Sequence, residues 1–234
     1  MSNPPTLKLA LLGHGKMGKA IETLAPERGF NVALVLDEIS NRDFQGITAK
    51  DFKGIDVCID FTVPDAAVEN IRRVAALGCN LVVGTTGWQD RLAEVRRAIE
   101  AAGVGMVYGA NFSIGVQLFY RAAQSLAKIF SGYPAYEPSI TEAHHRFKRD
   151  APSGTALELK REVQPLLPSR DLPVASIRAG YIPGSHELAF DSEADTVLLR
   201  HTARGRQGFA EGALYAARWV AGKKGLYSFA EILQ

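Results

Sequence analysis

The segment from Glu142 to Thr155 concentrates side chains that can move protons. Two adjacent histidines, His144 and His145, are followed by Lys148, and no long apolar run within the segment has to be buried. Histidine and lysine near one another can supply a proton to a carbon acid or an enamine. Solvated histidines and a basic surface pair of Lys148 with Arg149 are the alternatives. The histidines lack the spacing of a metal site and have no cysteine nearby, so we expect no bound metal.

The stretch Pro152-Ser-Gly-Thr155 precedes a predicted helix. The hydroxyl groups of Ser153 and Thr155, together with the first amides of that helix, form a group that can hold a carboxylate. In the alternative interpretation Ser153 is a helix N-cap and nothing more. The residues alone leave the catalytic and the structural interpretations of this segment about equally supported.

A second motif, Gly13-His-Gly15-Lys-Met-Gly18, lies directly after a strand-like run and opens a helix-like segment. Gly13 permits a tight turn, Gly15 allows a pyrophosphate to approach the backbone, and Gly18 allows close helix packing. Asp37 ends the next strand-like run, 19 residues past Gly18, where the acid that binds an adenosine ribose is expected. This context favours a dinucleotide site over a ligand-free glycine turn or a solvated acid.

Short apolar runs alternate with amphipathic segments as far as Asn111, which predicts a doubly wound parallel sheet of the Rossmann type. Helices are predicted at Asp65–Leu77 and Gln89–Ala102. The predicted strands are Leu7–Leu12, Val32–Leu36, Val57–Phe61, Leu81–Val83 and Val104–Tyr108.

After Asn111 the pattern changes to that of a smaller α+β domain with a mixed or mostly antiparallel sheet. The predicted helices are Ile114–Phe130, Thr155–Leu167 and a last one at Ala210–Ala221, with Gly222 as its C-cap. The predicted strands are a short one near Ser139–Thr141, then Val174–Tyr181, His186–Phe190 and Thr196–Thr202.

The composition excludes several functions. With 27 basic and 25 acidic side chains, the chain has no charge excess that would favour nucleic acid or a membrane surface. The N-terminus lacks the features of a signal peptide, and no apolar run is long enough to span a bilayer. Cys58 and Cys79 are expected to be core residues in a cytoplasmic protein.

The string E-A-H-H-R-F-K-R-D-A-P-S-G-T-A at Glu142–Ala156 closely resembles the signature of the 4-hydroxy-tetrahydrodipicolinate (dihydrodipicolinate) reductases of lysine biosynthesis. The resemblance covers nearly the whole chain. It includes, in order, Gly15–Gly18, Asp60–Pro64, Val83–Gly87, Ala110–Ser113, Arg178–Gly180, Phe209–Ala213, Trp219 and Gly222-Lys223.

The resemblance implies an enzyme that transfers a hydride from NADH or NADPH to a cyclic dicarboxylate. His144 would be the acid-base residue and Lys148 the proton donor, while His145, Ser153, Gly154 and Thr155 would bind the substrate. The cofactor would contact Gly13, Gly15, Lys16, Met17, Gly18 and Asp37, and on its nicotinamide side Gly84, Thr85, Thr86, Gly109, Ala110, Asn111 and Phe112.

The resemblance also implies a domain arrangement. Residues 1–111 and 208–234 would form the dinucleotide-binding domain, with the last helix folding back onto it. Residues 112–207 would form an inserted substrate-binding and oligomerisation domain that closes over the cofactor. Relatives are homotetramers paired through the sheet of that domain, and we expect the same here.

The chain departs from the family in a first loop shorter by one residue, in a shorter stretch before Asp60, and in having Glu38 where many relatives have Arg. Asp37 and Glu38 would repel a 2′-phosphate, although Lys16 or Arg42 could reach one, so we expect acceptance of both cofactors with a leaning towards NADH.

Two rival functions are an oxidoreductase acting on a sugar or semialdehyde and a non-catalytic dinucleotide sensor. Neither explains the segment from His144 to Thr155. Whether the enzyme also catalyses the preceding dehydration stays open.

Overall fold

The computed structural model describes residues 5–233, and the chain divides into two compact units. The first unit runs to Ile114 and resumes at Arg206, and the second comprises Gly115–Gly205. Among the described residues, no helix is both long and apolar enough to cross a bilayer.

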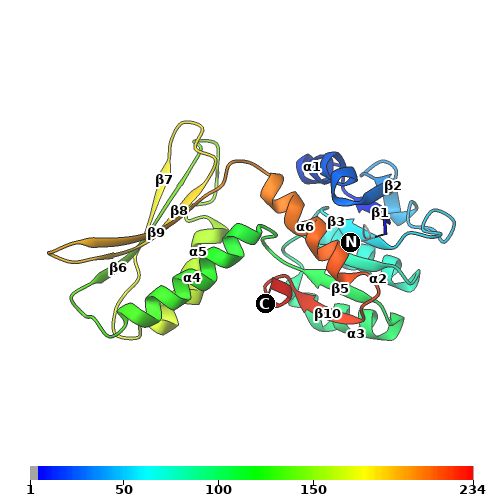
Figure 1. Cartoon of the computed structure of the whole chain (residues 1–234). Coiled ribbons are helices and arrows are strands. Elements are labelled where there is room, and N and C mark those ends of the chain that lie inside the picture. Colours follow the sequence, from blue (N-terminus) through cyan, green and yellow to red (C-terminus); the bar gives the residue numbers. More distant parts are fainter. Residues whose placement is uncertain (1–4, 234) are drawn as a thin grey trace. The chain divides into compact units, whose positions relative to one another are not determined.

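Six parallel strands form the sheet of the first unit (Figure 1), in the order β10-β5-β4-β3-β1-β2. Their bounds are β1 Leu7–Leu12, β2 Phe30–Leu36, β3 Val57–Asp60, β4 Asn80–Val83, β5 Gly105–Tyr108 and β10 Gly225–Ser228. The five strands that the sequence predicts are confirmed. The sixth, β10, is not predicted, because Gly-Leu-Tyr-Ser has neither a long apolar run nor clear alternation.

Alternate residues of these strands enter two separate cores, as a sheet buried on both faces requires. Leu9 and Leu11 pack with α1 (Lys16–Leu24) and α6 (Gln207–Val220), while Ala10 and Leu12 pack with α2 (Pro64–Ala76) and α3 (Leu92–Ala102). Cys58 and Cys79 are free thiols, both buried in the second of these cores, as predicted. The last helix, α6, therefore covers the same face of the sheet as α1.

The strand order reverses beside β1, which lies between β2 and β3. The chain leaves β1 towards one edge of the sheet and later returns to its other side. Loops from neighbouring strands separate at such a reversal, and the crevice at the carboxyl ends of the strands is where doubly wound sheets bind ligands.

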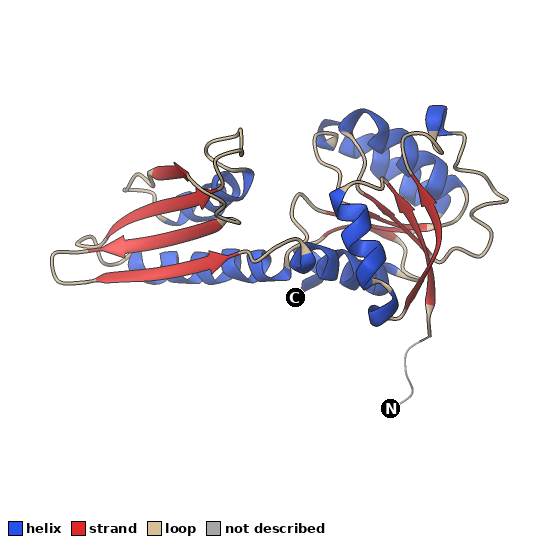
Figure 2. Ribbon diagram, turned by 90° about the horizontal axis from the view of Figure 1, so that it is seen from above, coloured by secondary structure: helices blue, strands red, loops and turns tan. Residues whose placement is uncertain are grey.

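The second unit is a four-stranded mixed sheet in the order β7-β6-β8-β9, with β6 and β7 parallel and the other pairs antiparallel. Two helices, α4 and α5, cover one face of it (Figure 2), where Ile140, Leu188 and Phe190 meet Phe119 and Leu159. The bounds are α4 Ile114–Phe130, β6 Glu137–His144, α5 Gly154–Val163, β7 Val174–Arg178, β8 Ser185–Asp191 and β9 Thr196–Thr202.

Three elements of this unit differ from the prediction by more than one residue at an end. The central strand β6 extends to His144, because its pairing with β8 reaches Ala143 and its pairing with β7 reaches His144. The helix α5 ends at Val163 and continues only as a 3-10 turn, because Pro165 lacks the amide that the helix would need. The strand β7 ends at Arg178, and Gly180 with a φ of 48° turns the chain away before Tyr181.

Candidate active site

A crevice of about 370 Å³ opens at the strand-order reversal of the first unit. It brings together the loops after β1, β3 and β4, which are far apart in sequence. The lining residues are Gly15, Lys16, Met17, Phe61, Thr62, Pro64, Gly84, Thr85 and Thr86. Six of the predicted cofactor residues thus share one cleft, and Phe61, Thr62 and Pro64 join them from the Asp60–Pro64 motif.

The glycines of this crevice are required by its geometry. A Cβ at Gly13, whose φ is 87°, would lie 2.3 Å from the carbonyl oxygen of Phe61, and a Cβ at Gly84 would lie 2.1 Å from the Phe61 ring. A Cβ at Gly18 would lie 2.1 Å from the carbonyl oxygen of Gly13. By contrast, a Cβ at Gly15 would meet nothing within 4 Å, so Gly15 leaves open space in front of the first turn of α1. Among the described residues, no side-chain hydrogen bond caps that helix start, and amides at a helix start are the kind of donors that a phosphate accepts from.

Asp60 holds the loops of the crevice in place. Its carboxylate is fully buried and accepts hydrogen bonds from the Thr62 backbone and hydroxyl, from the Thr85 hydroxyl and from the Asn70 amide. Burial raises the pKa of Asp60, although these hydrogen bonds act in the opposite direction. Through Thr62 and Thr85 the carboxylate ties the end of β3 to the end of β4.

Asp37 lies at the end of β2, in a turn that it shapes itself. Its Oδ1 accepts hydrogen bonds from the amides of Ile39 and Ser40 and from the Ser40 hydroxyl. The backbone and side-chain hydrogen bonds from Ser40 lower the pKa of Asp37. Asp37 is thus an ionised carboxylate that its own turn holds in place, and its role as a ribose-binding acid stays a prediction. Glu38 beside it is exposed.

The residues Gly109–Phe112 follow β5 at the same edge of the sheet but do not line the crevice. The Phe112 ring is 1% exposed and packs against Phe61 and Phe229, with ring centroids 6.0 and 4.6 Å away. The side chain of Phe112 therefore supports Phe61 from behind. Any contact that Phe112 makes with a cofactor would come from its backbone.

In the second unit, His144 ends the strand β6, and its Nδ1 is hydrogen-bonded to the carboxylate of Glu142 two residues earlier. Glu142 is fully buried. Its two oxygens also accept hydrogen bonds from the Arg178 guanidinium at 2.7 and 2.9 Å, and Oε1 accepts one from the Ser153 amide at 3.2 Å. The sequence gives no local signal for this group, because Arg178 comes from another strand.

Burial, hydrogen bonds and nearby charges together determine the protonation states of Glu142 and His144. Burial alone would raise the pKa of Glu142, but hydrogen bonds from Arg178, Ser176 and His144 lower it to about 2, so it is ionised. Burial lowers the pKa of His144 and outweighs the raising effect of Glu142, and the charges of Lys148 and Arg178 lower it further. His144 is therefore mainly neutral at pH 7, with its Nδ1 proton directed to Glu142.

Lys148 lies in the turn after β6, where its amide donates to the carbonyl oxygen of His145. Its ammonium group is 2.8 Å from the carboxylate of Asp150. The hydrogen bond from Lys148 lowers the pKa of Asp150. The loop thus holds the cation of Lys148 four residues after His144. Asp150, which pairs with Lys148, is exposed, so a ligand could take its place.

The start of α5 combines a side-chain N-cap with open space in front of its first turn. Ser153 is the N-cap, and its hydroxyl accepts the amide of Ala156 at 3.2 Å, so the structural role considered for Ser153 is present. A Cβ at Gly154 would meet nothing within 4 Å, and Thr155 is in the first turn. His145 is half-buried, and its Nδ1 has no hydrogen-bond partner among the described residues.

His186, on β8, also belongs to the group of side chains around Glu142 and His144, and the sequence does not reveal this. It pairs with Glu142 across the sheet, is 5% exposed, and its Nε2 lies 3.0 Å from the Ser153 hydroxyl. Burial lowers the pKa of His186 to about 4, so it is neutral. Only the register of β6 against β8 brings it beneath His144, with the ring centroids 5.1 Å apart.

Glu142, His144 and His186 place ligand atoms within 4.8 Å of one another, as a metal site would. The Arg178 guanidinium, however, already neutralises the only carboxylate of the three, and His186 is engaged with Ser153. We therefore interpret the cluster as a hydrogen-bonded network.

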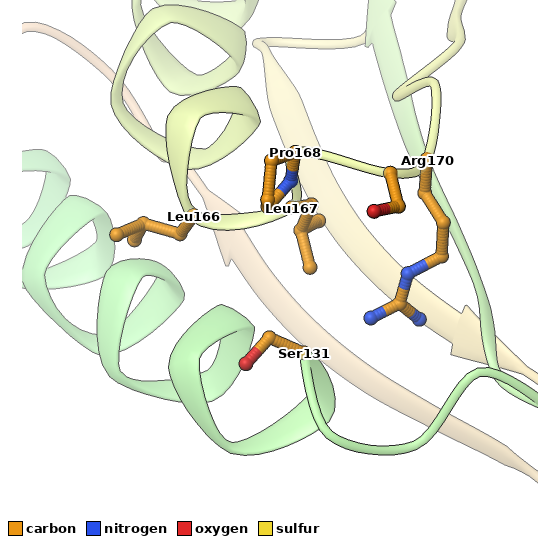
Figure 3. Close-up of a pocket in the computed structure, with 6 residues that line it drawn as sticks. Ser131, Leu166, Leu167, Pro168 and Arg170 are labelled. Atoms are coloured by element: carbon orange, nitrogen blue, oxygen red, sulfur yellow. The ribbon is translucent and has the colours of Figure 1, made fainter.

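A second cavity of about 370 Å³, between the end of α4 and the turn after α5, has a different character (Figure 3). The guanidinium of Arg170 in its wall donates to the carbonyl oxygens of Phe130, Tyr133 and Tyr136. Arg170 thus caps the carboxyl end of α4 and its following turn. The cavity has no proton-transfer group, in contrast to the cluster around His144.

Comparison with known proteins agrees with this geometry. The family model of the N-terminus of dihydrodipicolinate reductase matches residues 7–112, and that of its C-terminus matches residues 115–233. A 4-hydroxy-tetrahydrodipicolinate reductase of Christiangramia forsetii is 35% identical, over 97% of this chain and 98% of its own length. One from Neisseria gonorrhoeae is 32% identical over 97% of each chain.

Among solved structures, a dipicolinate-bound dihydrodipicolinate reductase from Paenisporosarcina sp. TG-14 has the same fold. The TM-score is 0.82, at 24% identity, over 97% of this chain and 99% of that one. Both units and both sheets are therefore those of this fold, and the first unit carries the nucleotide-binding domain. We conclude that the chain belongs to the dihydrodipicolinate reductase family, the NAD(P)H-dependent reductases that act on 4-hydroxy-tetrahydrodipicolinate in lysine biosynthesis.

Proposed function

We propose that His144 and Lys148 carry out the proton transfers of the reductase and that the start of α5 binds its substrate. The observation that carries this proposal is local. The His144 imidazole, the Lys148 ammonium and the start of α5 lie within one short stretch, and the Glu142–Arg178 ion pair contacts both ends of it.

The substrate is proposed to be a small ring with two carboxylates. The related structure from Paenisporosarcina is bound to dipicolinate, which is such a ring. A helix N-terminus attracts anions, and the open space at Gly154 allows a carboxylate to reach the first amides of α5. Thr155 and His145 would complete this carboxylate site, while Ser153 shapes it as the N-cap.

Reduction of a conjugated ring adds one hydride and one proton. The nicotinamide cofactor, when bound, supplies the hydride, and the residues of the first-unit crevice and Asp37 would hold it. Lys148 would give the proton to the enamine-like carbon, either directly or through water. Neutral His144 would exchange protons through Nε2, the ring nitrogen that the Glu142 contact leaves available.

The test is to replace His144 or Lys148 by Ala. We expect kcat to fall by about a hundredfold or more, the usual scale of general acid-base assistance, while NADH binding is unchanged. Lys160→Ala is the matched control, because Lys160 also faces an aspartate of the same unit, Asp171, at 3.5 Å. A His144 or Lys148 variant with nearly normal kcat at saturating substrate would remove that residue from the mechanism.

For the cofactor we propose dual use with a leaning towards NADH. Asp37 is fixed as a carboxylate at the end of β2, and the exposed Glu38 follows it. Both would repel a 2′-phosphate. Lys16 is exposed at the start of α1 and is the cation that we propose would oppose them.

We also propose that the protein is a cytoplasmic homotetramer that pairs through the sheet of the second unit. The face of this sheet opposite α4 and α5 carries Thr141, Ala143 and Ala189, together with Ile177 and Leu198, which are 47% and 52% exposed. The same face also carries Glu187 and Arg200, which form an ion pair 3.1 Å apart, and its exposed apolar side chains suit contact with another sheet. Sedimentation velocity would report the assembly, and Leu198→Lys would weaken it.

A further inference from the structure

We propose that Glu142 is a positioning residue, which sets the tautomer and orientation of His144 and fixes it relative to the start of α5. This inference deepens the proposed function and rests on it. Neither the substrate nor the cofactor would touch Glu142, because its side chain is fully buried.

The first step of the argument concerns the tautomer. A neutral imidazole carries one proton, and an ionised carboxylate can only accept a hydrogen bond. Since the Glu142 carboxylate contacts Nδ1 of His144, the proton must lie on Nδ1. The lone pair is then on Nε2, the nitrogen that remains for chemistry.

The second step concerns the orientation of the ring. His144 ends a strand and pairs with Arg178 of β7, so its backbone is held while its side chain has rotational freedom. The contact with Glu142 removes that freedom from one side. On the other side, Gly184 lies against the ring, since a Cβ there would be 3.0 Å from Nε2.

The third step concerns the charge. A buried carboxylate is costly unless it is paired. The Arg178 guanidinium supplies the pairing through two hydrogen bonds, and it also donates to the carbonyl oxygen of Asp150. The same ion pair therefore anchors the loop that carries Lys148.

The fourth step joins the two halves of the proposed substrate site. Besides contacting His144, Glu142 accepts the amide of Ser153, the N-cap of α5. Neutral His186 holds the Ser153 hydroxyl from the other side. One carboxylate thereby determines both where the imidazole lies and where the carboxylate-binding helix begins.

Glu142 could act on catalysis through His144, or it could only stabilise the fold through its ion pair with Arg178. A double-mutant cycle of Glu142 with His144 separates these two possibilities. We expect Glu142→Gln to lower kcat at least tenfold, with NADH affinity unchanged. In the His144→Ala background the same substitution should cost less than about twofold, because the residue through which Glu142 acts is gone. Equal losses in both backgrounds would overturn the proposal.

An NMR titration of the His144 imidazole gives a second readout. Glu142 favours the charged form of His144, whereas Lys148 and Arg178 disfavour it, and neutral His186 faces the same ring. Glu142→Gln should therefore lower the pKa of His144, and ¹⁵N shifts should show the proton on Nδ1 only in the parent protein. An unchanged tautomer and an unchanged pKa would contradict the proposal.

Glu142→Gln leaves Arg178 buried without its partner, which can destabilise the fold. The paired variant Glu142→Gln/Arg178→Gln removes both charges together, and we expect the same loss of kcat in it. Glu142→Asp, which keeps the charge, should recover part of the activity. A nearly normal kcat for His144→Ala alone would instead refute the proposed function, so the two failures are distinguishable.

Discussion

A Cβ added to Gly184 would lie 3.0 Å from Nε2 of His144. Gly184 has a φ of 128° and comes directly before β8, so the start of that strand passes beside the Nε2 edge of the imidazole. The absence of a side chain at this position leaves Nε2 accessible. The distance links the backbone beside β8 to the atom that we propose exchanges protons, at the end of the neighbouring strand β6.

The first prediction follows from this distance. Gly184→Ala should lower kcat at least tenfold, because the methyl group displaces the imidazole or blocks Nε2, and it should leave NADH binding unchanged. Gly180→Ala is the control: Gly180 also has a positive φ, but a Cβ there would meet nothing within 4 Å. Steady-state kinetics of both variants would decide, and equal losses would attribute the effect to backbone strain alone.

The second prediction concerns the carboxylate site at the start of α5. Thr155→Val should raise KM for the substrate about tenfold to a hundredfold, since a hydrogen bond to a charged group contributes ~1.5–3 kcal/mol. The value of kcat should change less. Thr155→Ser keeps the hydroxyl and should retain most of the affinity. If KM is the same in the Val variant, Thr155 serves the helix only.

How far the sequence predicts this protein depends on how local each feature is. The glycine loop and Asp37 follow from short-range patterns, and the alternation of short apolar runs with amphipathic segments predicts five of the six strands of the first sheet. The glutamate–arginine pair does not follow from any local pattern. Glu142 and Arg178 are 36 residues apart and meet only because β7 lies parallel beside β6.

His186 shows the same limit more sharply. On its own strand it occupies an ordinary inward position, in step with Leu188 and Phe190. Its polar role depends on the antiparallel register that places it opposite Glu142. A shift of one residue in this register would turn His186 to the other face, and the sequence does not state the register.

The third prediction uses the pKa of His186. Burial lowers this pKa from 6.5 to about 4, so the unfolded chain binds a proton between these values that the folded chain does not. Folding stability should therefore be complete above pH 6.5 and fall as the pH drops towards 4. The loss from His186 is at most about 3.5 kcal/mol, at about 1.4 kcal/mol for each pKa unit.

Denaturant unfolding of the parent protein and of His186→Gln, at several pH values between 7 and 4, measures this contribution. We expect the variant to have a smaller fall in stability across that window, whatever its stability at pH 7. His14→Gln, in the first unit, controls for the removal of a histidine. The contribution of Glu142 to the pH dependence of folding stability can be separated from that of His186. The pKa of Glu142 is lowered from 4.5 to about 2, so the stability that this group contributes is lost only below pH 4.5.

The fourth prediction concerns cofactor choice at the end of β2. Asp37 is held by its own turn, and Glu38 is exposed beside it, so a 2′-phosphate would approach two carboxylates. Lys16 is the opposing cation, but a flexible lysine must lose rotamer freedom to bind a phosphate. We expect kcat/KM for NADH to equal or exceed that for NADPH. Glu38→Arg should shift the ratio towards NADPH, and Lys16→Ala should shift it towards NADH.

All ratios must be measured at one ionic strength, because salt screens exposed charges. A tenfold or greater preference of the parent protein for NADPH would refute the role given to Asp37 and Glu38, and Lys16 would then be the residue that decides.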